Sequence, residues 1–313
     1  MSLRKSRSTS LSLILISFLM TQQRIPAVTQ VPQAVASAFS DLESRAEQGN
    51  SGAQYQLALS ILDRNPSPDD VQTAFKWLRA SVAQNNPNAA FYLGYFYEHG
   101  KFVPQDYGLA FQNYEIATRA HYPPAENNLA FLYQYGRGVR KNPGKAYEWY
   151  LAAAQHGDPV GQYNLAGFCY SGTGTSRNST EAVRWLRASA DSGLAEAENS
   201  LAAFYFYGIS VQRDYTEAAR LVRLAVQKGL PVAATSLGFL YEHGKGVPLD
   251  YVAAYAWYSR ATTAGDSASN ERRKQLAQIM TRKQLDEANA LATAQPPTQS
   301  TMSSITAFSP DSH

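Results

Sequence analysis

Five histidines are the side chains best suited to metal binding or acid–base chemistry in this sequence, and their pattern argues against both. His99 and His243 share one local context, because each lies in the sequence Glu-His-Gly-Lys. The two positions are 144 residues apart, so they occupy equivalent places in two distant copies of that sequence. A single glutamate–histidine pair supplies too few ligands for a zinc site. We therefore interpret both as structural residues and predict no metal site and no cofactor.

The motifs of nucleophilic and phosphate chemistry are missing from the central part of the chain. Residues 51–266 contain no GxSxG, HExxH, SxxK or CxxC sequence. The Gly-x-Gly sequences at 136–138 and 172–174 end helical patterns, whereas a phosphate loop follows a strand and opens a helix. We therefore predict that the protein is not an enzyme.

The Gly-x-Gly sequences and four of the five histidines lie in a pattern that repeats every 36 residues without insertion. Its most regular positions are a leucine and, seventeen residues later, an alanine. The leucines are Leu57, Leu93, Leu129, Leu165, Leu201 and Leu237, and the alanines are Ala74, Ala110, Ala146, Ala182, Ala218 and Ala254. Cys169, the single cysteine, stands where neighbouring copies carry tyrosine, and we expect it to be a small buried apolar residue.

Each repeat has the pattern of two helices. In the third copy, Ala125, Leu129 and Tyr133 are spaced by four residues, which places them on one stripe of a first helix. Gly136 then favours a helix end, because glycine adopts the left-handed conformation without a Cβ clash. The second helix of each copy is expected to begin beside an Asp or Asn that either caps it or lies in the turn just before it. These residues are Asp70, Asp106, Asn142, Asn178, Asp214 and Asp250.

The combined pattern resembles Sel1-like repeats, which are relatives of the tetratricopeptide repeats. The shared sequence is Ala-x-x-x-Leu-Gly/Ala-x-x-Tyr-x-x-Gly-x-Gly-Val, followed by Ala-x-x-Trp-Tyr and a closing Ala-x-x-Gly. It is strong in the copies that start near Ala125, Gly161 and Ala233, and weaker where Phe102 and Ser210 replace the second loop glycine. The resemblance implies an all-α protein, a right-handed superhelical α-solenoid of antiparallel helix pairs, with six units in residues 51–266.

The flanking segments differ from the repeats. We expect a capping helix at 34–50, a more polar capping helix at 267–293, and a disordered tail at 294–313 that is rich in Thr, Ser, Pro and Gln. Residues 1–27 resemble a signal peptide, with basic residues followed by the apolar segment 11–20. The protein is therefore expected to be exported, either periplasmic or secreted. The alternative is a membrane anchor at residues 8–20, and membrane contact is expected only if that segment remains uncleaved.

The net charge of +3 comes from this first segment. Residues 1–27 carry four basic residues and no acid, which leaves 24 basic against 25 acidic residues in the remainder. A chain so close to neutrality has no electrostatic attraction for nucleic acid. We therefore expect no nucleic-acid partner.

One face of the first helices combines aromatic rings with amides and hydroxyls. Its positions lie one residue before, two after and six after each repeated leucine, roughly opposite the packed stripe. Such a mixture suits the binding of a protein or peptide, although rings and amides on a helix also serve inter-helix packing. In tetratricopeptide arrays the first helices line a concave groove. By that resemblance the partner-binding candidates are Tyr92, Tyr95, Asn128, Phe131, Tyr135, Asn164, Tyr207 and Phe239.

The resemblance implies a binding scaffold. Bacterial proteins of this family include envelope regulators, assembly scaffolds and secreted factors that engage host cells, and we expect an exported scaffold that binds a protein or peptide. One alternative is a cell-wall-directed or peptidoglycan-directed binding protein or enzyme, which would need carboxylates converging in a pocket. Another is a structural spacer without a partner.

Overall fold

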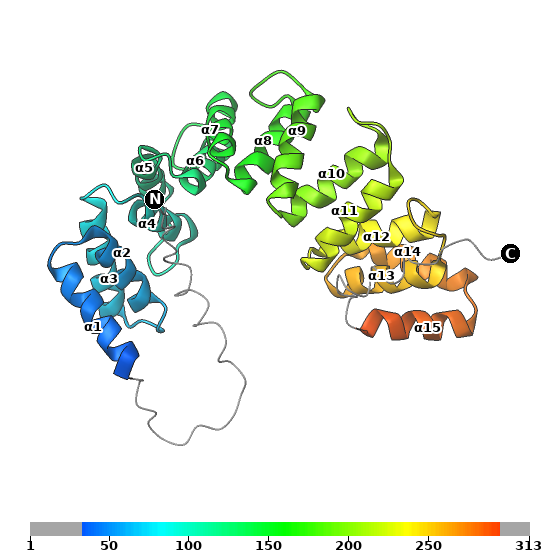
Figure 1. The fold of residues 1–313 in the computed structure, drawn as a ribbon, viewed down its shortest axis with the longest axis horizontal. Coiled ribbons are helices and arrows are strands. Elements are labelled where there is room, and N and C mark those ends of the chain that lie inside the picture. Colours follow the sequence, from blue (N-terminus) through cyan, green and yellow to red (C-terminus); the bar gives the residue numbers. More distant parts are fainter. Residues whose placement is uncertain (1–32, 295–313) are drawn as a thin grey trace, which may run out of the picture.

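The computed structural model describes residues 33–294 as fifteen α-helices, without a strand in that range, and the helices follow one another along an arch (Figure 1). This architecture confirms the prediction of an all-α solenoid. Within the same range, no helix combines the length and apolar character needed to cross a membrane. The expectations for residues 1–27 and for the tail beyond residue 294 lie outside the described residues.

Each of the six repeats contributes one first helix and one second helix. The first helices are α2 (Ser51–Leu62), α4 (Pro87–His99), α6 (Pro123–Tyr135), α8 (Pro159–Ser171), α10 (Ala195–Tyr207) and α12 (Pro231–His243). The second helices are α3 (Pro68–Val82), α5 (Tyr107–Thr118), α7 (Pro143–Gln155), α9 (Ser179–Asp191), α11 (Tyr215–Gln227) and α13 (Tyr251–Thr263). The flanking helices are α1 (Gln33–Glu47), α14 (Ser267–Ile279) and α15 (Arg282–Thr293).

The helix boundaries follow the expected capping residues, except at α3. Five second helices begin at the predicted Asp or Asn, whose side chain accepts hydrogen bonds from backbone N–H groups of the first turn. The expectation for Asp70 was wrong, because this residue lies within the first turn of α3. Ser67 caps α3, and Asp70 closes a capping box three residues later by accepting the Ser67 N–H. Pro68 explains the earlier start, because its fixed φ suits the first position of a helix.

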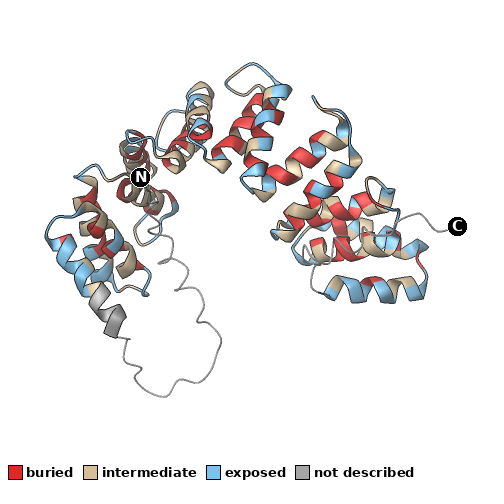
Figure 2. Cartoon of the chain, viewed as in Figure 1, coloured by how far each residue is buried: buried red, intermediate tan, exposed pale blue. Residues whose placement is uncertain are grey.

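The repeated leucines and alanines form the core between the two layers of helices. The six leucines are at most 4% exposed and the six alanines at most 1%. In Figure 2 the buried positions follow the contact between first and second helices along the array. Because each repeat has only one such face, stacking on the next repeat completes its burial.

A buried tyrosine hydroxyl distinguishes three of the repeats. Tyr114 donates a hydrogen bond to Glu98 Oε2 (2.6 Å), and burial and then the Glu98 carboxylate raise the pKa of Tyr114. Tyr150 donates to Gln134 (2.7 Å) and Tyr258 to Glu242 (2.7 Å) in the same way. The other three repeats carry aliphatic residues at the tyrosine position and no acid or amide opposite. These pairs are Leu78 with Leu62, Leu186 with Tyr170, and Val222 with Phe206.

The tyrosine and its acceptor therefore occur together along the chain. A buried hydroxyl without an acceptor is unfavourable, which explains why the acid or amide is present only where the tyrosine is present.

The C-terminal segment 267–293 differs from the single capping helix that we expected, because it forms two helices. Met280 is extended, and Thr281 begins α15 with a capping box that it shares with Gln284. This strong helix start interrupts the pattern. Helix α15 packs against α13, where Ala288 joins a buried cluster with Tyr258 and Leu276.

Arg260 of α13 fastens the end of α15, and its removal should loosen that helix. The guanidinium donates to the carbonyls of Leu291 (2.7 Å), Ala292 (3.2 Å) and Ala294 (2.7 Å), which are unpaired groups at a helix C-terminus. The Arg260→Ala variant should lower the stability of the α13–α15 contact by about 1–2 kcal/mol. Hydrogen exchange of the α15 amides should be faster.

A control is available on α15 itself. Arg282 is 90% exposed and pairs only with Asp286 in the same helix, so Arg282→Ala should leave exchange in α15 nearly unchanged. Equal exchange in the two variants would show that Arg260 does not hold this helix.

Candidate partner-binding face

The structure places the eight predicted site residues on first helices but with unequal exposure. Tyr135, Tyr207 and Phe239 are exposed, at 54%, 62% and 37% of their surface. The other five are half-buried, namely Tyr92, Tyr95, Asn128, Phe131 and Asn164. Tyr92 contacts the rings of Tyr55 in the preceding repeat and of Phe96 in its own helix. Its ring is therefore engaged in packing between repeats.

Ring pairs in contact run along one side of three first helices. Phe131 and Tyr135 have ring centroids 4.6 Å apart, and the spacing of four residues places them on one stripe. The ring centroids of Tyr95 and His99, and those of Phe239 and His243, are 4.2 Å apart. Each histidine Nδ1 also lies 3.0 Å from the backbone carbonyl four residues before it. This supports the structural interpretation of His99 and His243, which lie in the last turns of their helices.

Arg137 adds a cation to the ring pair on α6. Its guanidinium carbon lies 5.1 Å from the centroid of Phe131, 5.7 Å from that of Tyr135 and 5.2 Å from that of Tyr107. Cation–π contacts of this kind hold an exposed arginine beside aromatic rings. The face at α6 therefore presents rings and a positive charge together.

The two asparagines lie in a hydrogen-bonded chain that links successive repeats. Asn128 Nδ2 donates to Tyr114 Oη (3.0 Å), Asn127 Nδ2 donates to Asn128 Oδ1 (3.2 Å), and Asn164 Nδ2 donates to Asn127 Oδ1 (2.8 Å). With the Tyr114–Glu98 bond, the chain joins α4, α5, α6 and α8. Each of these side-chain amide nitrogens carries a second N–H besides the one that donates within this chain of hydrogen bonds. These contacts give Asn128 and Asn164 a structural role, and their role in binding stays a prediction.

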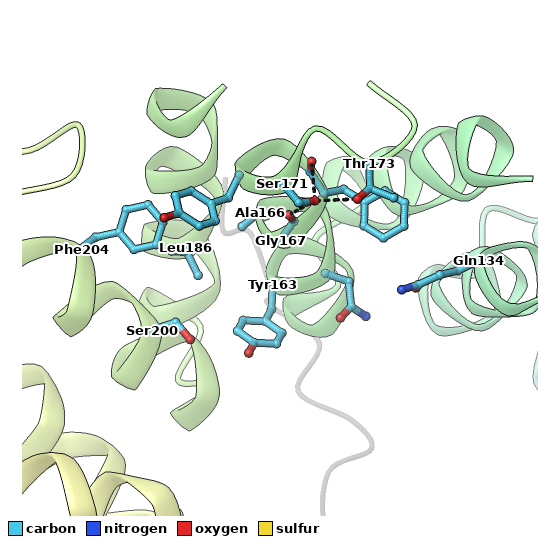
Figure 3. A pocket seen from close by; sticks show the side chains of 12 residues that line it. Gln134, Tyr163, Ala166, Gly167, Ser171, Thr173, Leu186, Ser200 and Phe204 are labelled. Atoms are coloured by element: carbon cyan, nitrogen blue, oxygen red, sulfur yellow. Dashed lines mark hydrogen bonds between the residues drawn. The ribbon is translucent and has the colours of Figure 1, made fainter. Parts of the chain in front are cut away.

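A groove opens at the fourth repeat, where the ring at the second position after the leucine is replaced by Gly167. The groove has a volume of about 370 Å³. Figure 3 shows Gln134 of α6 on one side, Ser200 and Phe204 of α10 on the other, and Tyr163 and Gly167 of α8 between them. A Cβ at Gly167 would meet no atom within 4 Å. The lining contains amides, hydroxyls and rings but no carboxylate.

A second groove, of about 460 Å³, lies beside α9 and α11 and is charged. Two of its acids are neutralised by basic partners, since Glu198 contacts Lys228 Nζ at 2.5 Å and Glu217 contacts Arg220 Nε at 2.7 Å. Carboxylates paired with lysine and arginine are poor general acids and bases. Asp191 is the remaining acid of this groove, so in the described part of the chain neither groove brings together the two unpaired carboxylates that a glycan-cleaving enzyme requires.

Cys169 is 2% exposed, as expected from its place in the repeat. Burial raises the pKa of the thiol, which disfavours the reactive thiolate. The residue is therefore part of the core.

One cluster of potential ligands escaped the sequence analysis. His121, Glu126 and His156 each offer a ligand atom, and these atoms lie within 4.8 Å of one another. His99 and His243 occupy identical repeat positions, whereas these two histidines are 35 residues apart, one short of the period. That near-period spacing, beside a glutamate on the intervening helix, was the signal available in the sequence.

Comparisons with known proteins agree with this geometry. The family model described as "Sel1 repeat" matches residues 51–86, 87–122, 123–158, 159–194, 195–230 and 231–266. A search of curated proteins found no match.

Two solved structures are similar to this chain. One is a protective antigen of uropathogenic Escherichia coli strains with an SLR fold (TM-score 0.72, 27% identity, covering 81% of this chain). The chain spans 55% of that protein's length. The other is a Sel1 repeat protein from Oxalobacter formigenes (TM-score 0.61, 26% identity, covering 72% of this chain and 95% of that one).

Proposed function

Because the chain belongs to the Sel1 repeat family, whose repeats form non-catalytic scaffolds that generally mediate protein–protein interaction, we propose that it is an exported scaffold that binds an extended segment of a partner protein along its first helices. The sequence of residues 1–27 supports export. The similar E. coli protein is described as a protective antigen, which fits a place in the envelope or outside the cell.

The observation that carries the proposal is the series of exposed rings on four successive first helices. Tyr135 on α6, Tyr207 on α10 and Phe239 on α12 are at least 37% exposed, and Tyr170 on α8, one residue off this face, lines the groove at 36% exposure. Large exposed apolar groups that follow one another across a surface are typical of interaction sites. Tyrosine is also enriched among the residues that dominate binding energy.

The dimensions of this face suit a short extended peptide. Helices in direct contact lie about 8–10 Å apart, and α8, α10 and α12 are joined mainly through the second helices between them, so the three steps from α6 to α12 span at least ~30 Å. An extended chain advances about 3.3 Å per residue, which gives a segment of at least about nine residues. Amides and hydroxyls in the groove at Gly167 can bond its backbone, while the rings contact its side chains.

Site-specific photo-crosslinking tests where a ligand binds. Peptides of about nine residues would first be selected from a random display library with the protein as bait. A benzoylphenyl side chain would then be introduced into the protein, either at Ser171 in the groove or at the exposed Glu148 of α7. We expect peptide adducts from position 171 and none from position 148. Adducts only from position 148 would contradict the proposal.

A further inference from the structure

A buried carboxylate and two histidines meet where the third repeat contacts its neighbours. Glu126 of α6 is 1% exposed, and its Oε2 lies 2.8 Å from His156 Nδ1. Its other oxygen, Oε1, lies 3.8 Å from His121 Nδ1. His121 belongs to the turn before α6, and His156 to the turn after α7. The centroids of the two imidazole rings are 4.9 Å apart.

The pair of Glu126 and His156 alone has a structural explanation. Residues at the same two positions also pair in two other repeats, because Gln84 donates to Gln54 (2.9 Å) and Lys228 donates to Glu198 (2.5 Å). Each of these pairs joins residues 30 apart and ties the end of a second helix to its own first helix. A histidine that donates to a buried glutamate is one further version of this contact.

The presence of His121 is not explained by an equivalent residue in the other repeats. At the equivalent turn position the chain carries glycine five times and asparagine once, namely Gly49, Asn85, Gly157, Gly193, Gly229 and Gly265. His121 adopts the left-handed conformation of these residues, with φ of +52°. Asn85 also adopts this conformation, and histidine tolerates it better than most residues, so the backbone accepts His121 but does not explain why an imidazole stands in this turn.

We propose that His121, Glu126 and His156 bind a zinc ion, with water completing its coordination. Two imidazole nitrogens and a carboxylate are a ligand set that zinc accepts, and three protein ligands leave a position open. Tetrahedral zinc with bonds of about 2.0–2.1 Å places neighbouring ligand atoms roughly 3.3 Å apart. The present separations therefore require only small movements, and His121 can make them because its side chain is 75% exposed.

The ion would connect two consecutive inter-repeat turns of the solenoid to one buried carboxylate. His121 lies between α5 and α6, whereas His156 lies between α7 and α8, so the ligands span the third repeat from end to end. The metal would thus fix the position of α6, whose other end carries Tyr135 and leads into the loop residue Arg137. The buried Glu126 carboxylate would gain a charged partner in the ion.

The test is zinc binding to the full chain without a histidine tag, by calorimetry and by the visible spectrum of Co²⁺ as a substitute ion. We expect one tight site per chain and a higher melting temperature with Zn²⁺. His121→Gly removes one ligand but installs the glycine found in the other repeats, so the variant should fold at least as well. Its affinity for Zn²⁺ should fall at least 100-fold, and Zn²⁺ should no longer raise its melting temperature.

Asn85→Gly makes the matched change at the same turn of the preceding repeat and should bind Zn²⁺ as the wild type does. Glu126→Gln tests the carboxylate and should also weaken binding. Equal Zn²⁺ affinity of the wild type and His121→Gly, or failure of the wild type to bind one ion per chain, would overturn the proposal.

Discussion

Replacement of Tyr114 by leucine should lower the free energy of unfolding by about 3 kcal/mol. The substitution removes the hydroxyl that donates to Glu98, whose side chain is buried at 7% exposure. A buried acceptor that loses its partner keeps its full desolvation cost, and the cost is larger when the group is charged. Asn128 loses a partner at the same time, because it donates to Tyr114 Oη.

The double variant Glu98→Leu/Tyr114→Leu should recover most of this loss. It copies the first repeat, in which Leu62 and Leu78 occupy the same two positions and are buried. Replacing both partners of a buried polar pair by apolar groups is often nearly neutral. The expected coupling between the two substitutions is therefore about 1–3 kcal/mol.

Denaturant titration of the four proteins in this cycle measures the coupling. Repeat arrays can unfold in parts, so hydrogen exchange of α4 and α5 should accompany the titration. A double variant as unstable as the sum of the two single variants would mean that the hydroxyl and the carboxylate do not depend on each other.

The triple variant Tyr135→Ala/Tyr207→Ala/Phe239→Ala should weaken binding of a selected peptide at least 100-fold. These rings are the exposed aromatic members of the predicted site, and a ring that anchors a partner commonly contributes 2 kcal/mol or more. The loss of about 2.7 kcal/mol that corresponds to 100-fold is modest for three such residues. Fluorescence polarisation with a labelled peptide measures the affinities.

Tyr251→Ala is the matched control for this variant. Tyr251 is 36% exposed but begins α13, a second helix, so its removal should leave affinity within twofold of the wild type. Substitutions of exposed rings should also change stability little. A triple variant that binds as the wild type does would exclude these rings from the binding site.

The sequence predicted the parts of the fold that repeat. Leu129 and Ala146 recur in all six units because every unit needs the same core contact, and Gly136 recurs in five because those first helices end in the same way. The pattern could therefore be read several times in one chain. The second loop position shows the limit of this rule. Phe102 and Ser210 adopt the left-handed conformation there although they are not glycine.

The candidate site was predicted less completely, because its contacts cross from one repeat to the next. The packing of Tyr92 depends on Tyr55 of another repeat, and the bonding of Asn128 depends on the orientation of the Tyr114 hydroxyl. A periodic pattern identifies the exposed side of a helix but not which neighbour covers it. His121 was missed for a related reason. It becomes a potential metal ligand only because Glu126 and the turn that carries His156 lie beside it in the fold.

The most direct test of the binding face is the affinity of a selected peptide for Gly167→Trp. The new side chain would enter the groove, while the fold should persist because Gly167 is an exposed helical residue with no neighbour near its Cβ position. Glycine is also the weaker helix former, so the melting temperature should not fall. Gly167→Ala is the control and should bind as the wild type does. We predict at least tenfold weaker binding by Gly167→Trp at unchanged stability, and unchanged affinity would contradict a partner site in this groove.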